Sequence, residues 1–258
     1  PGAPCSVDVL SHDAAAARTF YAGVFGWEFA GPGAMPDGGD YHVARLGEAD
    51  VAGVGSAPDD VGAVPWPTYV RVASLEETAA RAVAAGARVI ADPFDALPAG
   101  RAAAVSDPAG GVIGLWEPAA RAGAARVNEP SAWAMSVLQP SDPQAATAFY
   151  EAVFGWQAWT PPGDTSGMVL WRLPGYFGGE PSQPVPRDVV AAMLPAQDDG
   201  PAGWLVDFWI ADADAAATAA ARLGGSVLAE PHDAPPFRRA VLADPSGATF
   251  TVSQLVAY

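Results

Sequence analysis

The sequence is poor in cysteine, in histidine and in basic residues. Its one cysteine, Cys5, excludes an intrachain disulfide and a thiolate metal cage. It has three histidines, and 13 basic residues stand against 29 acidic ones, which gives a formal net charge of −16. With this balance and without a basic stripe, nucleic acid is not an expected partner, and the acidity serves solubility.

Long hydrophobic runs are also absent, although half of the residues are hydrophobic. No stretch approaches the roughly 18 uncharged apolar residues of a membrane-spanning helix. Residues 1–10 lack the basic start and the apolar run of a signal peptide. We therefore expect a cytoplasmic protein that does not bind a membrane, long enough for two domains of ordinary size.

An internal repeat organises the chain. The segment Asp13–Trp27 contains Phe-Tyr-x-x-Val-Phe-Gly-Trp, and it recurs as Asp142–Trp156. Each copy predicts an amphipathic helix that begins at an aspartate and ends at a glycine. A second landmark, Asp-Pro-x-Gly between apolar runs, predicts a hairpin turn at 107–110 and again at 244–247.

The order of these landmarks divides the chain into two domains. We predict a first domain at residues 1–118, a linker at 119–130 and a second domain at 131–258. Each domain divides again into two units of strand, helix and three strands. The second copy carries a few extra residues, which we place in the Pro- and Gly-rich stretch 174–203. The sequence therefore predicts four βαβββ modules in tandem.

The two landmarks resemble those of the vicinal oxygen chelate superfamily, which includes glyoxalase I, extradiol dioxygenases, fosfomycin-resistance enzymes and bleomycin-binding proteins. The resemblance covers nearly the whole chain, and within the superfamily it is closest to a tandem actinobacterial type. It implies an α+β fold, in which four βαβββ modules form two curled, mixed-sheet open barrels of the glyoxalase/bleomycin resistance type. The ligand site is then expected on the concave face of each barrel.

The resemblance also implies a divalent metal ion held by His or Gln on the first strands and by Glu on the last strands. Counting from the landmarks places six other residues at these positions: Ser6, Pro67, Gly114, Met135, Leu205 and Thr251. None is a normal ligand for such a cation, apart from the weak hydroxyl ligands of serine and threonine. The histidines lie elsewhere, His12 at a helix start, His42 in a strand and His232 in a loop, so we predict neither a metal nor a cofactor.

Strand alternation predicts which other side chains line the barrels, because residues two apart share a face. The candidate ligand-binding residues are Tyr69, Arg71, Trp116, Gln139, Trp159, Trp171, Trp209 and Ser253. Asp8 and Asp207 are the candidate catalytic residues, because an apolar strand seldom carries a central carboxylate without a partner. Asp8 could simply form an ion pair with Arg71. Asp207 has no evident basic partner in its own strand, and Arg172 is a distant candidate.

These residues leave more than one function open. The favoured hypothesis is a metal-independent protein that binds a hydrophobic, aromatic natural product for sequestration, self-resistance or a biosynthetic accessory role. The alternative is a metal-independent enzyme of secondary metabolism, such as a cyclase, an isomerase or a hydroxylation-related enzyme, that uses Asp207 or Asp8 as its acid or base. A metal enzyme with relocated ligands would use Asp8, Asp207 and His42. The protein could act with a partner enzyme of a biosynthetic pathway under either of the first two hypotheses. It could be a monomer or a homodimer.

Overall fold

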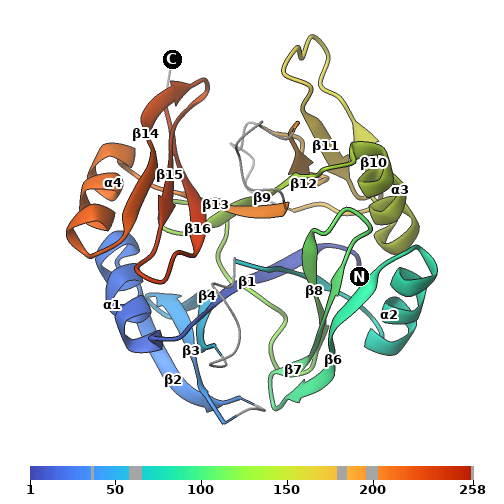
Figure 1. The fold of residues 1–258 in the computed structure, drawn as a ribbon, viewed down its shortest axis with the longest axis horizontal. Helices are drawn as coiled ribbons and strands as arrows, with labels where there is room; N and C mark the ends of the chain where they lie inside the picture. Colours follow the sequence, from blue (N-terminus) through green and yellow to red (C-terminus); the bar gives the residue numbers. More distant parts are fainter. Residues whose placement is uncertain (36–37, 58–65, 179–184, 196–202, 257–258) are drawn as a thin grey trace. The chain divides into compact units, whose positions relative to one another are not determined.

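The computed structural model describes every residue except 36–37, 58–65, 179–184, 196–202 and 257–258. The first copy contains two βαβββ modules (Figure 1). The first module comprises β1 (Pro4–Ser11), α1 (Ala14–Phe25), β2 (Glu28–Ala34), β3 (Asp40–Leu46) and β4 (Ala49–Ser56). The second comprises β5 (Thr68–Arg71), α2 (Leu75–Ala84), β6 (Arg88–Ala96), β7 (Gly100–Ser106) and β8 (Val112–Pro118).

The second copy repeats this order. Its front module comprises β9 (Trp133–Gln139), α3 (Pro143–Phe154), β10 (Gln157–Trp159), β11 (Val169–Arg172) and β12 (Val189–Met193). Its rear module comprises β13 (Gly203–Trp209), α4 (Ala213–Arg222), β14 (Ser226–Ala234), β15 (Phe237–Ala243) and β16 (Thr249–Leu255). Strand β12 falls inside the stretch 174–203, where we placed only the extra residues of the second copy.

The strands form two eight-stranded mixed sheets. Their orders are β2-β3-β4-β1-β5-β8-β7-β6 and β10-β11-β12-β9-β13-β16-β15-β14. Within each module the first strand pairs in parallel with the last, and the remaining neighbours are antiparallel. The predicted α+β fold of four βαβββ modules is therefore confirmed. Among the described helices, none combines the length and the apolar character that crossing a membrane requires.

The repeated helix begins and ends as its sequence predicts. Asp13 caps α1 by accepting a hydrogen bond from the Ala16 N–H at 2.8 Å, and Asp142 caps α3 in the same way. Gly26 ends α1 with φ 73°, and Gly155 ends α3 with φ 75°. Only glycine adopts this left-handed conformation without strain, so the Phe-Gly-Trp ending turns the chain into the next strand.

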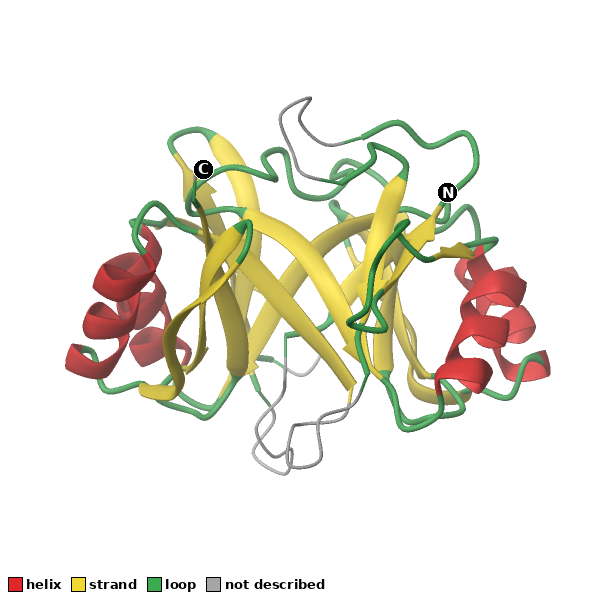
Figure 2. Cartoon of the chain, turned by 90° about the horizontal axis from the view of Figure 1, so that it is seen from above, coloured by secondary structure: helices red, strands yellow, loops and turns green. Residues whose placement is uncertain are grey.

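The chain forms two compact units, and each takes one module from each copy. One unit comprises Pro1–Ser6, Pro67–Gly123 and Met135–Trp204, and the other comprises Val7–Trp66, Ala124–Ala134 and Leu205–Tyr258. Within the units, α2 lies beside α3 and α1 lies beside α4 (Figure 1), and Figure 2 gives a second view of helices side by side. The predicted domain boundaries describe the duplication of the sequence and remain a prediction, because the compact units follow a different division.

The two landmarks of the repeat meet in these cores. Tyr21 of the first copy donates its hydroxyl to Asp244 Oδ2 of the second copy at 3.0 Å, and it accepts a hydrogen bond from Trp66 Nε1 at 3.1 Å. In the other unit, Tyr150 makes the reciprocal bonds with Asp107 and Trp204 (Figure 1 shows the elements involved). The Phe-Tyr motif of one copy therefore binds the Asp-Pro-x-Gly turn of the other.

Each module packs its helix against one face of its strands, and we call the opposite face the helix-free face. In β1, Val7 and Val9 are fully buried in the core that contains α1, so Asp8 between them belongs to the helix-free face. The same alternation places the predicted wall residues of β5, β9 and β13 on that face, as described below.

Candidate functional site

The clearest candidate site lies on the helix-free face of β13. Val206 and Phe208 are fully buried in the core that contains α4, so Asp207 and Trp209 point to the other side of the strand. This confirms the predicted register of the strand. In the parallel pair with β16, Asp207 lies opposite Thr251, and Trp209 lies opposite Ser253.

Asp207 is 5% exposed, and the hydrogen bonds that it accepts all reach one of its two carboxylate oxygens. Thr251 Oγ1 donates to Asp207 Oδ1 at 2.5 Å, and Ser253 Oγ donates to the same atom at 2.7 Å. Arg239 Nη2 lies 3.5 Å from Oδ1. The second oxygen, Oδ2, accepts no hydrogen bond from any residue in the described part of the chain.

Arg239 is the basic partner of Asp207, and the sequence alone did not reveal it. It lies on β15 opposite Ser253 and donates from Nε to Ser253 Oγ at 3.0 Å. No basic partner stands on β13 itself, as expected, but the distant candidate Arg172 was wrong, because Arg172 binds Asp188 and the partner of Asp207 lies on β15. A signal was available, because residues 239 and 253 are equally distant from Ser246 of the Asp-Pro-Ser-Gly turn. We call Asp207, Arg239, Thr251 and Ser253 the Asp207 cluster.

Two aromatic rings accompany the Asp207 cluster. The centroids of Trp209 on β13 and Phe237 on β15 are 6.2 Å apart, with the ring planes at 45°. Both side chains are half-buried. Aromatic rings with one accessible face offer apolar area and stacking to a flat ligand. The helix-free face of this module therefore combines a carboxylate, a guanidinium and aromatic rings within one compact unit.

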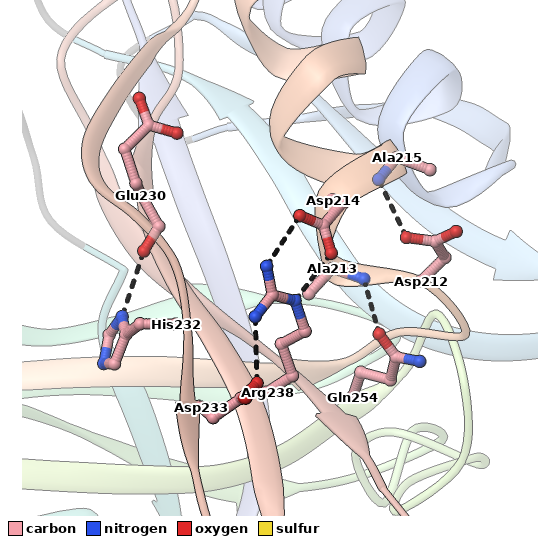
Figure 3. Close-up of polar contacts among 9 residues, drawn as sticks. All are labelled: Asp212, Ala213, Asp214, Ala215, Glu230, His232, Asp233, Arg238 and Gln254. Carbon is pink, nitrogen blue, oxygen red and sulfur yellow. Dashed lines mark hydrogen bonds and ion pairs between the residues drawn. The ribbon is translucent and has the colours of Figure 1, made fainter.

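The neighbouring residue Arg238 points to the other face of β15. It binds Asp214, in the first turn of α4, at 2.6 Å and Asp233 of β14 at 2.9 Å (Figure 3). Hydrogen bonds to these two carboxylates raise the pKa of Arg238 above its ordinary value. Adjacent residues of a strand alternate between its faces. Arg238 therefore joins the sheet to α4, and Arg239 points to the face away from α4.

The second candidate carboxylate, Asp8, lies in the first module. It is 6% exposed and accepts a hydrogen bond from the Tyr41 hydroxyl at 3.0 Å. Gly53 makes this possible, because a Cβ atom added there would lie 1.9 Å from the Tyr41 hydroxyl oxygen. The predicted ion pair between Asp8 and Arg71 remains a prediction, since the two residues belong to different compact units.

The rear module of the first copy presents aromatic residues instead of a carboxylate. Tyr69 lies opposite Gly114, and Arg71 lies opposite Trp116, all on the helix-free face. Trp116 donates from Nε1 to the Arg121 carbonyl at 2.9 Å. The structure therefore places Tyr69, Arg71 and Trp116 together as predicted, while their role in ligand binding remains a prediction.

The front module of the second copy carries a hydrophobic cluster on its helix-free face, with Arg172 over the Trp159 ring at 5.5 Å. Trp159 packs with Met135, Val137 and Leu170 in a hydrophobic cluster that is separate from the helix-side core. Alternation along β9 puts Gln139 on the same face as Met135 and Val137. The predicted position of Trp171 was wrong. This side chain is fully buried in the helix-side core against Tyr150, Trp156 and Trp204, because it alternates with Leu170 along β11.

His42 bears on the predicted relocated metal site, and Cys5 bears on nucleophilic catalysis. Alternation along β3 puts His42 on the same face as the buried Ala44, which is the face that packs against the helix. His42 therefore points away from the face of Asp8, and the predicted metal site with relocated ligands is wrong in this respect. Burial and the nearby Arg18 lower the pKa of His42. His232 lies in strand β14 rather than in the expected loop. Burial raises the pKa of the Cys5 thiol to about 12, so it is a weak nucleophile.

The positions at which the resemblance implies metal ligands do not fit that role. The Thr251 hydroxyl is donated to Asp207, and Gly114 lies beneath Tyr69, where an added Cβ would be 2.4 Å from the ring. In the part of the chain that the structure describes, no group of three or more His, Cys, Asp or Glu side chains could hold a metal ion. We therefore derive no chemistry through a metal at these positions.

Comparison with known proteins agrees with this fold. A family model described as a glyoxalase-like domain matches residues 6–116 and again residues 135–253. The chain therefore belongs to the glyoxalase-like domain family, and its predicted resemblance to the vicinal oxygen chelate superfamily is confirmed.

Relatives and structurally similar proteins match nearly the whole chain. CFP32 of Mycobacterium tuberculosis (strain CDC 1551 / Oshkosh), a protein whose name includes the word glyoxylase, is 35% identical over 97% of this chain and 94% of its own length. The anthracycline biosynthesis protein DnrV of Streptomyces peucetius is 32% identical over 99% of this chain and 94% of its own. The Mn(II)-bound glyoxalase from Novosphingobium aromaticivorans has a TM-score of 0.64 at 20% identity, with 99% of this chain and 82% of that chain covered. At that identity the structural match supports the fold alone.

Proposed function

We propose that this chain binds a hydrophobic, aromatic natural product without using a metal ion, in sequestration, self-resistance or an accessory step of secondary metabolism. The observation that carries the proposal is the Asp207 cluster beside Trp209 and Phe237. A mainly apolar surface with a few fixed polar groups is typical of small-molecule sites. The name of DnrV, a relative described as an anthracycline biosynthesis protein, supports the choice of secondary metabolism.

Binding is measured by isothermal titration calorimetry against a panel of aromatic polyketides, with mass spectrometry of each mixture after incubation. We expect saturable binding, unchanged ligand mass and no stoichiometric metal in protein purified without chelators. The variant Trp209→Leu should weaken binding on the order of ten-fold, because a stacked aromatic partner contributes about 1 kcal/mol beyond its buried area.

The matched control for this variant is Trp159→Leu, which removes a half-buried tryptophan from another module. If ligand affinity falls with Trp159→Leu and not with Trp209→Leu, the Asp207 cluster is not the site. Absence of binding across the panel would refute the proposed function. Appearance of a product would replace the binding protein with an enzyme.

One observation favours a metal-independent enzyme as the second candidate function. The Asp207 Oδ2 atom accepts no hydrogen bond from the described residues, so it is free to accept a proton or to orient a hydroxyl group. If a panel compound is converted, Asp207→Asn should lower the rate about 100-fold or more. The control Asp214→Asn, which changes a carboxylate on the opposite face, should retain the rate.

A further inference from the structure

We infer that the Asp207 cluster recognises a fused planar aromatic molecule that carries a hydroxyl group beside a ring carbonyl. This inference rests on the proposed function and names the class of ligand that the same face would bind. It depends on three features of the rear module of the second copy: an acceptor, a donor and an aromatic surface whose positions are fixed by strand register.

The acceptor is the Oδ2 atom of Asp207. Both neighbouring hydroxyl groups and Arg239 are directed at Oδ1, so they hold the carboxylate in one orientation. An ionised carboxylate oxygen can only accept a hydrogen bond. Asp207 as a residue is 5% exposed, and Oδ2 has no donor in the described part of the chain, so a ligand on the helix-free face could supply one. A phenolic hydroxyl is a neutral donor on a flat ring, and it could donate a hydrogen bond to this atom.

The donor is the guanidinium group of Arg239. Its Nε binds Ser253, and its Nη2 faces Asp207, while Nη1 contacts no acceptor among the described residues. The side chain is 29% exposed, so the group is reachable from the helix-free face. Arginine cannot accept a hydrogen bond, and its remaining N–H groups require an acceptor such as a carbonyl oxygen.

The aromatic surface lies at a distance that suits a fused ring system. Arg239, Ser253 and Trp209 form one row across β15, β16 and β13. Adjacent strands are about 4.8 Å apart, so the backbones at Arg239 and Trp209 are separated by roughly 10 Å. The rings of Trp209 and Phe237 have centroids 6.2 Å apart, so a ligand that contacts both rings and the polar pair is broader than a single phenyl group.

The first copy lacks this combination at the equivalent positions. Tyr69 takes the place of Asp207, and its ring covers Gly114, where the second copy has Thr251. Ala102 takes the place of Arg239 opposite the last strand. Arg71 lies on that face, but it takes the place of Trp209 and no carboxylate takes the place of Asp207. Of the two rear modules, only that of the second copy should therefore distinguish hydroxylated from hydroxyl-free aromatic ligands.

The test compares two probes, quinizarin (a dihydroxyanthraquinone) and its dimethyl ether. The ether carries a methyl group in place of each hydroxyl hydrogen, so it cannot donate a hydrogen bond. Calorimetry on the full chain should give tighter binding of quinizarin by on the order of ten-fold to a hundred-fold, the factor expected for a hydrogen bond to a charged group. The visible absorption band of quinizarin should shift to longer wavelength on binding, because the hydrogen bond to the carboxylate polarises the hydroxyl group and increases the electron density on its oxygen.

Two variants and a matched control locate the effect. Arg239→Gln should weaken the binding of both probes, because both carry the ring carbonyl, and Arg238→Gln, which changes the neighbouring arginine on the other face, should not (Figure 3). Asp207→Asn replaces an acceptor oxygen with an N–H donor, so it should abolish the spectral shift and favour the dimethyl ether. If that variant does not fold, as judged by circular dichroism, the arginine pair carries the test.

The outcomes separate the two proposals. If neither probe nor any other aromatic compound binds the wild-type chain, the proposed function is refuted together with this inference. If both probes bind equally, or if Arg239→Gln and Arg238→Gln behave alike, the proposed function stands and the ligand class inferred here is wrong.

Discussion

Replacing Tyr150 with phenylalanine removes one hydroxyl group from the core that joins the two copies. Tyr150 is fully buried and donates to Asp107 Oδ2 at 2.8 Å. It also accepts a hydrogen bond from Trp204 Nε1 at 2.8 Å. The variant therefore leaves a carboxylate oxygen and an indole N–H without the partner that each has in the native core.

The expected cost follows from these two losses. A hydrogen bond to a charged group contributes about 1.5–3 kcal/mol, and a buried donor left unsatisfied costs about 1–3 kcal/mol. Because the two effects share one hydroxyl group and do not add fully, we expect a loss of about 3 kcal/mol in the free energy of unfolding. For a chain of this length, that corresponds to a fall of roughly 6–12 °C in melting temperature.

Urea unfolding followed by tryptophan fluorescence measures the change, with the slope of the transition as a check on its cooperativity. Tyr176→Phe is the matched control, since the Tyr176 hydroxyl makes no hydrogen bond with a described residue, and its effect should stay within about 0.5 kcal/mol. A Tyr150→Phe variant as stable as this control would refute the reasoning that the reciprocal Tyr-Asp bond holds the copies together.

Three further predictions follow from the same structure. Burial, with the charge of the neighbouring aspartates, raises the pKa of Tyr21 and Tyr150. Their stabilising contribution is complete below the unfolded pKa of about 10 and is lost as the pH rises above that value. The urea midpoint should therefore fall at alkaline pH, and it should fall less steeply in the variant with phenylalanine at both positions. Gly53→Ala should cost about 1–3 kcal/mol by displacing the Tyr41 ring, whereas Gly33→Ala, whose added Cβ meets its nearest neighbour at 3.6 Å, should cost less in the same unfolding assay. The two copies, expressed as separate chains cut within the linker, should co-purify, because each compact unit contains modules from both; two folded copies that elute separately would contradict this.

Local sequence signals predicted much of the fold. An aspartate and a glycine bracket α1 and α3, and the alternation of apolar residues placed Asp8 and Asp207 on the face away from the helices. The prediction failed where neighbours are brought together by strand pairing. Arg239 was missed because its contact with Asp207 crosses β16, and Trp171 was misplaced because one position along a short strand decides which face a side chain occupies.

The sequence by itself determined that the chain is a duplication of βαβββ modules, because helix caps, turn residues and apolar periodicity act over a few neighbouring residues. Only the tertiary structure decided that the Phe-Tyr motif of each copy binds the Asp-Pro-x-Gly turn of the other. It also decided which oxygen of Asp207 is occupied and which arginine stands beside it. Such pairings join residues far apart in the chain, and their selection depends on packing and strand register rather than on local sequence preference.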